Sequence, residues 1–252
     1  AGDAVIGHIA PGEKRFLVSG YQGQLSARGE SLELRNTAGT VIATTTWAPA
    51  PTPAQQWLRV SEIHYAPAPP TPAETSQIPG LVSSDFEFLE LVNTGPVALD
   101  LAGARFVEGI TFTLPAGTTL APGARLVVAA NTAALALRAP AAGPVVGNWW
   151  GRLDNNGERL QLIDGTGETV LDFAYNDTWH PWTEDHGHSL VMLDEAGTPY
   201  NAWDDRTRWG VSQQPGGSPG TAAAVGVAYS ALLNLFTPEE RDNPAISGPS
   251  AN

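Results

Sequence analysis

The sequence contains no cysteine and no run of apolar residues long enough to cross a membrane. The absence of cysteine excludes a disulfide-stapled scaffold, a zinc site with thiolate ligands and catalysis by a thiol nucleophile. A membrane-spanning helix needs roughly 18 or more consecutive apolar residues, so no membrane span is expected in this chain. The first residues, Ala1-Gly2-Asp3, do not resemble a signal peptide.

Positive charge is also scarce. The 252 residues include 13 Lys and Arg against 26 Asp and Glu, giving a formal net charge of −13, and Lys14 is the only lysine. Binding to nucleic acid or to anionic lipid depends on clustered cations, and the largest cluster here is Lys14-Arg15. Nucleic acid and membrane surfaces are therefore not expected as partners. A lysine-poor chain rich in alanine, proline and glycine is typical of a GC-rich bacterial genome.

Glycine and proline are abundant by contrast, with 27 and 21 residues. Hydrophobic residues make up 42% of the chain, which is enough for a packed core. This composition favours short strands joined by tight turns. A chain of this length is expected to form one large domain or two smaller ones.

Part of the sequence occurs twice. Ala10-Pro11-Gly12 and the apolar residues after it return at Ala121-Pro122-Gly123, and six later positions match at a single offset of 128 residues (153 − 25 = 128). The later copy has more strand pattern before its Ala-Pro-Gly motif. The early copy is therefore expected to be the second half of a domain, in a longer tandem array that this chain enters in mid-domain. The matched pairs are Leu25/Leu153, Gly29/Gly157, Glu30/Glu158, Leu32/Leu160, Leu34/Leu162 and Gly39/Gly167.

Alternation of apolar and polar residues predicts strands separated by turns. Asn156-Gly157 and Asp164-Gly165 are typical hairpin turns, whereas the proline-rich stretch 66–80 is expected to be an exposed loop without strand or helix. One predicted strand, 105–114, is expected to bend at Gly109. The spacing predicts an all-β fold, an antiparallel β-sandwich. The predicted strands are 57–65, 85–92, 105–114, 126–130, 159–163, 169–175 and, last, 189–193.

The C-terminal residues follow a different pattern. Residues 221–236 carry apolar side chains without a strand-breaking turn. Thr237-Pro238-Glu239-Glu240 combines an N-cap residue, proline at the first helical position and acids in the first turn. A short helical segment is therefore expected after the sandwich.

Five pieces of sequence stand in order across residues 58–220, at 60–63, 88–93, 120–123, 156–162 and 187–190. Together they resemble the lamin tail domain in its bacterial, extracellular form. The resemblance implies an immunoglobulin-like sandwich of two sheets with no catalytic residues of its own. It also implies a place in a large secreted or cell-surface protein, often beside hydrolase domains. The chain departs from the family in the loop 66–80 and in an insertion at 131–150. The five pieces are Val60-Ser61-Glu62-Ile63, Phe88-Leu89-Glu90-Leu91-Val92-Asn93, Leu120-Ala121-Pro122-Gly123, Asn156-Gly157-Glu158-Arg159-Leu160-Gln161-Leu162 and Gly187-His188-Ser189-Leu190.

The resemblance and the repeat together predict three parts. Residues 1–56 are expected to be a partial lamin-tail-like repeat, residues 57–220 a complete one, and residues 221–252 a helical or linker segment. The strands expected near 16–19, 32–35 and 41–46 of the partial repeat would lack their sheet partners if nothing precedes Ala1. Unpaired edges with an apolar face favour docking on the complete domain or rapid hydrogen exchange.

A cluster of histidines is the sharpest local candidate for a metal site. Asp185, His186 and His188, with His180 nearby, offer imidazole and carboxylate ligands for zinc or calcium. The alternative, a polar loop that leads into the next strand, is favoured because consecutive loop residues rarely converge on one ion. No cofactor is therefore expected. Two acidic stretches, 154–157 and 164–168, suggest calcium loops but are better interpreted as hairpin turns.

The acidic residues of the second strand do not predict an enzyme. Glu87 and Glu90 are three residues apart, so they lie on opposite faces of a strand and cannot flank one glycosidic bond. Both are expected to be structural or solvated. The Gly-x-Ser-x-Gly motif of a serine hydrolase is absent.

Tryptophans are the best functional candidates. Trp149, Trp150, Trp179 and Trp182 lie in the loop-rich half of the complete repeat, where exposed rings can stack on sugars or anchor a protein partner. The alternative is that they cap the core. Because Trp149 and Trp150 are adjacent, at least one of them is expected to be exposed.

These inferences predict a non-catalytic structural or interaction module of a large secreted or cell-surface bacterial protein. Its expected partners are neighbouring domains of the same polypeptide, a surface protein or a polysaccharide. The alternative is a polysaccharide-binding accessory module of an exported hydrolase. A third interpretation is a part of an enzyme whose active site lies outside this chain.

Overall fold

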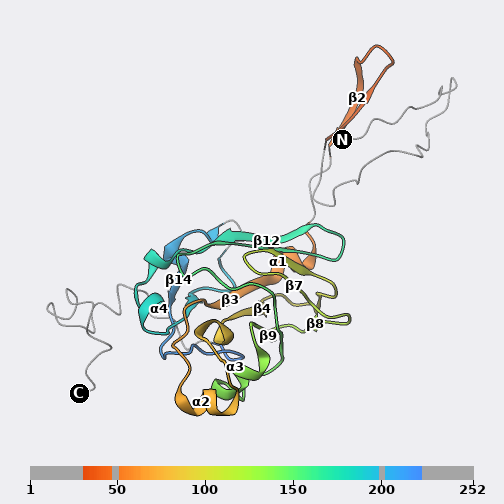
Figure 1. Ribbon diagram of the computed structural model, residues 1–252. Helices are drawn as coiled ribbons and strands as arrows, with labels where there is room; N and C mark the ends of the chain where they lie inside the picture. The colour runs from red at the N-terminus through yellow and green to blue at the C-terminus, as the bar shows by residue number, and fades with distance from the viewer. Residues whose placement is uncertain (1–30, 47–50, 199–201, 223–252) are drawn as a thin grey trace. The chain divides into compact units, whose positions relative to one another are not determined.

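A computed structural model describes residues 31–46, 51–198 and 202–222, which Figure 1 shows in colour. The chain divides into two compact units, residues 1–51 and 52–252. The second unit begins ahead of the predicted residue 57, because helix α1 (Pro53–Trp57) packs with it and Gln55 Nε2 donates to Thr169 O at 2.8 Å. The predicted strand near 16–19 and the predicted C-terminal helix lie outside the described residues.

The described part of the first unit is a hairpin. Strands β1 (Ser31–Arg35) and β2 (Val41–Thr46) pair antiparallel, with a bulge between Leu34 and Arg35. Asn36 closes the turn, since its Oδ1 accepts hydrogen bonds from the amides of Ala38 and Thr40. Most side chains of both strands are exposed.

The second unit is a sandwich of two main sheets. One sheet has six strands in the order β10-β9-β4-β3-β13-β14 and the other has four in the order β12-β11-β6-β7, while β5 and β8 form a small ribbon. Apart from the parallel pair β9–β10, neighbouring strands run antiparallel. This architecture confirms the predicted all-β, immunoglobulin-like antiparallel sandwich. The strands are β3 (Leu58–His64), β4 (Phe88–Asn93), β5 (Leu99–Asp100), β6 (Arg105–Glu108), β7 (Phe112–Thr113), β8 (Thr119–Leu120), β9 (Arg125–Ala129), β10 (Val145–Gly147), β11 (Arg159–Ile163), β12 (Thr169–Ala174), β13 (Leu190–Met192) and β14 (Trp209–Val211).

Alternation along the strands fills the space between the two sheets. Leu89 and Leu91 of β4 face Leu160 and Leu162 of β11 in one core cluster, and all four are fully buried. Burying one such side chain contributes about 1.5–3 kcal/mol. The two largest fully buried residues, Trp203 and Trp209, join the same core.

The predicted bent strand at 105–114 is wrong. The chain reverses there, so that β6 and β7 form a hairpin in which Phe106 pairs with Phe112. Gly109 has a φ of +81°, and a Cβ at this position would lie 2.5 Å from Leu160 Cδ2. The glycine therefore provides a turn that a residue with a side chain would strain.

The loop prediction for 66–80 is also wrong, because helix α2 (Pro72–Gln77) forms within it. Thr71 caps the helix by accepting from the amide of Glu74, and Glu74 accepts from the amide of Thr71 in return. Proline at the first helical position is tolerated because its missing N–H would have had no partner there. The same arrangement of Thr52, Pro53 and Gln55 starts α1.

The insertion 131–150 also folds, into helix α3 (Thr132–Arg138) and strand β10. Leu135 of α3 packs on Phe88, Val127 and Ala129, which point away from the main core, so α3 covers the outer side of the six-stranded sheet. Figure 1 shows α2 and α3 below the sheet and β12 above it. Two further corrections concern the strands: the 3₁₀ helix η1 (Ser83–Phe86) occupies the start of the predicted strand 85–92, and β14 follows the strand predicted as the last.

Short helices complete the second half. They are η2 (Asp177–Trp179), α4 (Trp182–Asp185) and η4 (Arg206–Arg208). No helix among the described residues has the length and hydrophobicity that crossing a bilayer requires.

Candidate interaction surface

The segment 145–151 crosses from one sheet to the other and turns two adjacent tryptophans to opposite sides. Its first part, β10, pairs with β9 of the six-stranded sheet. Asn148 then adopts a left-handed conformation (φ 64°), and Trp150 bridges Thr111 through two backbone hydrogen bonds of 3.0 Å. Trp149 is 7% exposed within the core, whereas Trp150 is 79% exposed. One of the two is therefore exposed, as the alternation predicted.

Trp150 lies on the outer face of the four-stranded sheet. Residues directly opposite one another in an antiparallel bridge share a face, so Trp150 points the same way as Thr111. Thr111 is exposed, whereas the next residue, Phe112, packs against the core. The ring therefore projects from the β7 edge of the sheet, away from its buried side.

The same face carries polar and aliphatic side chains. Arg159 of β11 donates from Nε and Nη2 to the carboxylate of Asp172 on β12, at 2.6 and 2.5 Å, and Gln161 Nε2 donates to the same carboxylate at 3.0 Å. Val107 of β6 is 40% exposed. The outer face of this sheet therefore carries an exposed indole at its β7 edge and a guanidinium, an amide and a carboxylate on β11 and β12. Such a face can combine stacking with hydrogen bonding to a ligand.

The other predicted tryptophans are less accessible. Trp179 on η2 is half-buried and packs on the main core. Trp182 on α4 is half-buried too, with its ring centroid 4.7 Å from that of His186 and 5.9 Å from that of His188. Both follow β12, which is the opposite edge of the four-stranded sheet from β7. The structure therefore presents Trp150 as the most exposed ring of the predicted set.

The histidines near α4 are engaged in packing and hydrogen bonds. His188 Nδ1 lies 2.7 Å from Ser212 O, and His180 Nε2 lies 3.0 Å from Trp209 O. Burial lowers the pKa of both imidazoles. In the part of the chain that the structure describes, no three His, Cys, Asp or Glu side chains gather as metal ligands would.

Among the described residues of the second unit, three glutamates are buried: Glu62, Glu87 and Glu90. Glu87 is 2% exposed and Glu90 is 1% exposed, so neither is solvated. Glu87 accepts from the amide of Leu153 at 2.8 Å, and burial raises its pKa to about 8. With so little exposure, these carboxylates have no access to a substrate.

Glu62 and Glu90 lie opposite each other on β3 and β4 and hold the segment 217–220. Glu62 accepts from the hydroxyl of Ser189 and from the amide and hydroxyl of Ser218, and burial raises its pKa to about 7. Glu90 accepts from Ser61 Oγ at 2.7 Å, from Arg125 Nη1 at 2.6 Å and from the amide of Gly220 at 2.6 Å. Sequence reasoning missed Glu62 because its partners lie 127 and 156 residues further along the chain.

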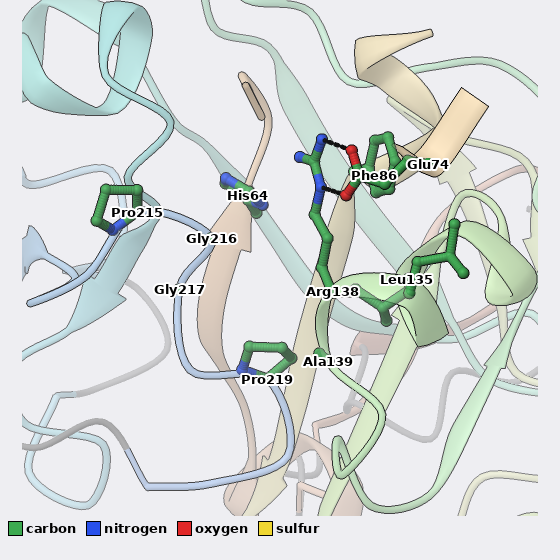
Figure 2. Close-up of a pocket in the computed structure, with 11 residues that line it drawn as sticks. His64, Glu74, Phe86, Leu135, Arg138, Ala139, Pro215, Gly216, Gly217 and Pro219 are labelled. Carbon is green, nitrogen blue, oxygen red and sulfur yellow. Dashed lines mark hydrogen bonds and ion pairs between the residues drawn. The ribbon is translucent and has the colours of Figure 1, made fainter. Parts of the chain in front are cut away.

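A cavity of about 400 Å³ lies between α3 and the segment 215–219. Figure 2 shows Arg138 and Glu74 facing each other beside Phe86, with His64, Pro215 and Pro219 around the remaining wall. Arg138 donates to both carboxylate oxygens of Glu74 and to the carbonyls of Ala68 and Pro69, and its guanidinium carbon lies 3.4 Å from the centroid of Phe86. This residue therefore fastens the segment 66–80 to α3.

Comparison with known families supports one assignment. The profile of the family described as Lamin Tail Domain matches residues 51–177, half of the chain. The match includes β3 to β12 and Trp150, and it ends before α4, β13 and β14. No curated protein resembles the chain closely enough to count as a match.

Proposed function

The chain belongs to the lamin tail domain family, whose members are non-catalytic, immunoglobulin-like interaction modules, and on that basis we propose that its second unit docks a partner through the outer face of the four-stranded sheet. The observation that carries the proposal is the 79% exposure of Trp150. A tryptophan left in water at this level costs solvation energy that contact with a partner would recover.

The backbone around Trp150 suits such a role. Two hydrogen bonds to Thr111 fix the main chain of Trp150. Asn148, two residues before Trp150, is held by its Oδ1, which accepts from the amide of Thr132 at 3.0 Å. A tryptophan side chain has only about two rotatable bonds, so it loses little conformational entropy on binding, which is typical of residues that dominate interface energies. Rigid placement therefore favours contact as the purpose of this surface.

We place the module in a large secreted or cell-surface bacterial protein, where neighbouring domains, a surface protein or a polysaccharide are the partners. The support is the resemblance of residues 58–220 to the bacterial, extracellular form of the family, together with the lysine-poor composition. Fractionation of the producing cells should find the natural protein at the surface or in the medium. Recovery only from the cytoplasm would contradict this placement.

We also propose that residues 1–56 are the second half of another lamin tail domain. The support is the 128-residue offset that links six positions of the two copies. Such an arrangement is a tandem array, in which modules follow one another along one polypeptide.

Replacement of Trp150 by alanine should weaken binding to surface material of the producing cells by at least about tenfold. The melting temperature should change little, since truncation of an exposed side chain usually alters stability by about 0.5 kcal/mol or less. Val82→Ala is the matched control, because Val82 is also an exposed hydrophobic residue, at 56%, but lies before η1. Equal binding by the native chain and the Trp150→Ala variant would exclude this surface.

A polysaccharide-binding accessory module of an exported hydrolase is the second candidate. The specific observation in its favour is the Arg159–Asp172–Gln161 network on the same face as Trp150, since sugars are bound by stacking and by planar polar groups together. A glycan array separates the two candidates. Binding to defined glycans that is lost with Trp150→Ala favours the accessory module, whereas binding to surface protein alone favours the first candidate.

We propose that neither candidate needs a metal ion. Titration calorimetry of the chain with millimolar calcium or zinc should show no binding heat and no change in the melting temperature. Saturable heat that is removed by His186→Ala and His188→Ala would establish the metal site that the sequence suggested and would overturn this proposal.

A further inference from the structure

The hairpin of the first unit repeats a hairpin of the second unit in its pairing as well as in its sequence. Leu32 pairs with Thr45 and Leu34 with Ala43, while Leu160 pairs with Phe173 and Leu162 with Leu171. The residue numbers of corresponding positions in the two hairpins all differ by 128 (160 − 32 = 128; 173 − 45 = 128). The hairpin β1–β2 is therefore the counterpart of β11–β12.

The irregularity of the two hairpins also agrees. One bulge falls between Leu34 and Arg35 and the other between Leu162 and Ile163, again 128 residues apart (162 − 34 = 128). A bulge sets the twist of a hairpin and the direction of its side chains. Corresponding positions of the two hairpins therefore point to the same side of the hairpin.

Their surroundings differ sharply. Leu160 is fully buried and Val170 is 6% exposed, but their counterparts Leu32 and Ile42 are 37% and 59% exposed. Leu34, the counterpart of the fully buried Leu162, is half-buried. In the second unit, the leucines of β11 are buried in part by β6, which pairs with β11 so that Phe106 lies opposite Leu162. At the same offset the counterpart of β6 would precede residue 1 (105 − 128 = −23).

We infer that the hairpin β1–β2 is an acceptor for a β6-type strand, with an aromatic residue opposite Leu34, from the first half of a lamin tail domain that precedes it in the same polypeptide. This inference rests on the proposed tandem arrangement and names the contact that completes the partial copy. A two-stranded hairpin is marginally stable in water, whereas a third strand and a second sheet would bury its apolar face.

The offset also favours a partner in the same polypeptide over a second molecule. The family match ends at residue 177, which corresponds to residue 49 (177 − 128 = 49), and the second unit starts at residue 52. The part of the early copy that corresponds to the family match would therefore end where the second unit begins, which is the spacing of head-to-tail repeats. At the same offset β13 would fall inside β3 (190 − 128 = 62), so the early copy has no separate counterpart of β13. A covalently attached partner has a high effective concentration and would outcompete a free copy.

A fusion tests the inference. Because Leu25 corresponds to Leu153, residues 58–152 are placed directly before Leu25 of a chain that then runs to residue 252. Hydrogen exchange of the hairpin peptides 31–46 should slow by at least about tenfold relative to the 252-residue chain. A Leu34→Asp substitution in the fusion should remove this protection, and Glu33→Gln, on the other face of β1, should preserve it.

Hairpin exchange as fast in the fusion as in the parent chain, with β3 and β4 of the added half protected, would overturn the inference. Slow exchange in the parent chain together with a dimer in sedimentation would also overturn it, because the partner would then be a second copy. If the added half does not fold, a peptide of residues 102–114 added to the parent chain decides. If this peptide slows hydrogen exchange of the hairpin and its Phe106→Ser version does not, the inference is supported. If neither peptide slows the exchange, the inference is overturned. The binding experiment on Trp150 concerns the second unit and is unaffected by this outcome.

Discussion

Replacement of Arg125 by methionine is expected to lower the free energy of unfolding of the second unit by about 3–5 kcal/mol. Arg125 bridges Glu90 and Glu195, and its side chain is 12% exposed while that of Glu90 is 1% exposed. Methionine fills much of the same volume but supplies neither charge nor donors. The substitution therefore leaves Glu90 buried without a counter-charge.

Denaturant titration at pH 7.5 measures this effect. Arg159→Met is the matched control, because Arg159 also pairs with a carboxylate but its side chain is 55% exposed. Exposed pairs contribute about 1 kcal/mol or less, so the control should remain close to the native chain. The double substitution Glu90→Gln/Arg125→Met should recover part of the loss. If both arginine substitutions lowered the free energy of unfolding equally, the buried ion pair would contribute no more to stability than the exposed one.

Stability is expected to fall as the pH rises from about 6.5 to 8.5. Burial raises the pKa of Glu62 to about 7 and that of Glu87 to about 8, both from an ordinary value of 4.5. The folded state therefore binds protons that the unfolded state has already lost. Stabilisation from these protons is complete below pH 4.5 and is lost through the folded pKa values, with a total effect of a few kcal/mol.

Groups with lowered pKa values act in the opposite direction at lower pH. Burial lowers the pKa of His64 to about 4, and the pKa values of His180 and His188 are lowered as well. Below their ordinary value of 6.5, protonation favours the unfolded chain. The hydrogen bonds from Arg138 lower the pKa of Glu74 to about 2, which adds a further loss in strong acid. The melting temperature should therefore be highest near pH 6.

A pair of variants isolates the glutamates. The double substitution Glu62→Gln/Glu87→Gln should flatten the pH dependence of the melting temperature between pH 6.5 and 8.5, since glutamine keeps an oxygen that accepts hydrogen bonds but does not titrate. Glu108→Gln, at an exposed position of β6, should leave it unchanged. A native chain whose stability is constant or increases over this range would refute the prediction.

The sequence predicted best those features that depend on neighbouring residues. Asn156-Gly157 and Asp164-Gly165 marked the turns around β11, and the alternation after them gave the buried Leu160 and Leu162. The β-sandwich followed from such short-range patterns. The repeat likewise located both hairpins before their pairing was seen.

The missed helices had a readable signal. Thr71-Pro72-Ala73-Glu74 is a capping box with proline at the first helical position, but the surrounding prolines suggested a loop throughout. The pattern Thr237-Pro238-Glu239-Glu240 was interpreted as a helix start, whereas the similar sequence at residues 71–74 was not. Proline at a helix start is favourable, so its position matters more than its abundance.

The candidate surface required tertiary information. Alternation predicted that one of Trp149 and Trp150 would be exposed, and only the bridge to Thr111 decides which one. The buried carboxylates were beyond short-range patterns for the same reason. Arg125 lies 35 residues from Glu90, and the fold alone brings Gly220 to it.

The hydrogen bonds that tie residues 217–220 to Glu62 and Glu90 have a mechanical consequence. Helix α1 leads directly into β3, and Glu62 of β3 accepts hydrogen bonds from the amide and hydroxyl of Ser218. Tension applied between Thr52 and Thr221 would therefore load β3 from both directions and would be carried on to β4 through Glu90 and Gly220. Force applied in this way would pass through β3 and β4 in the middle of the six-stranded sheet, and the segment that carries Trp150 would lie outside its path.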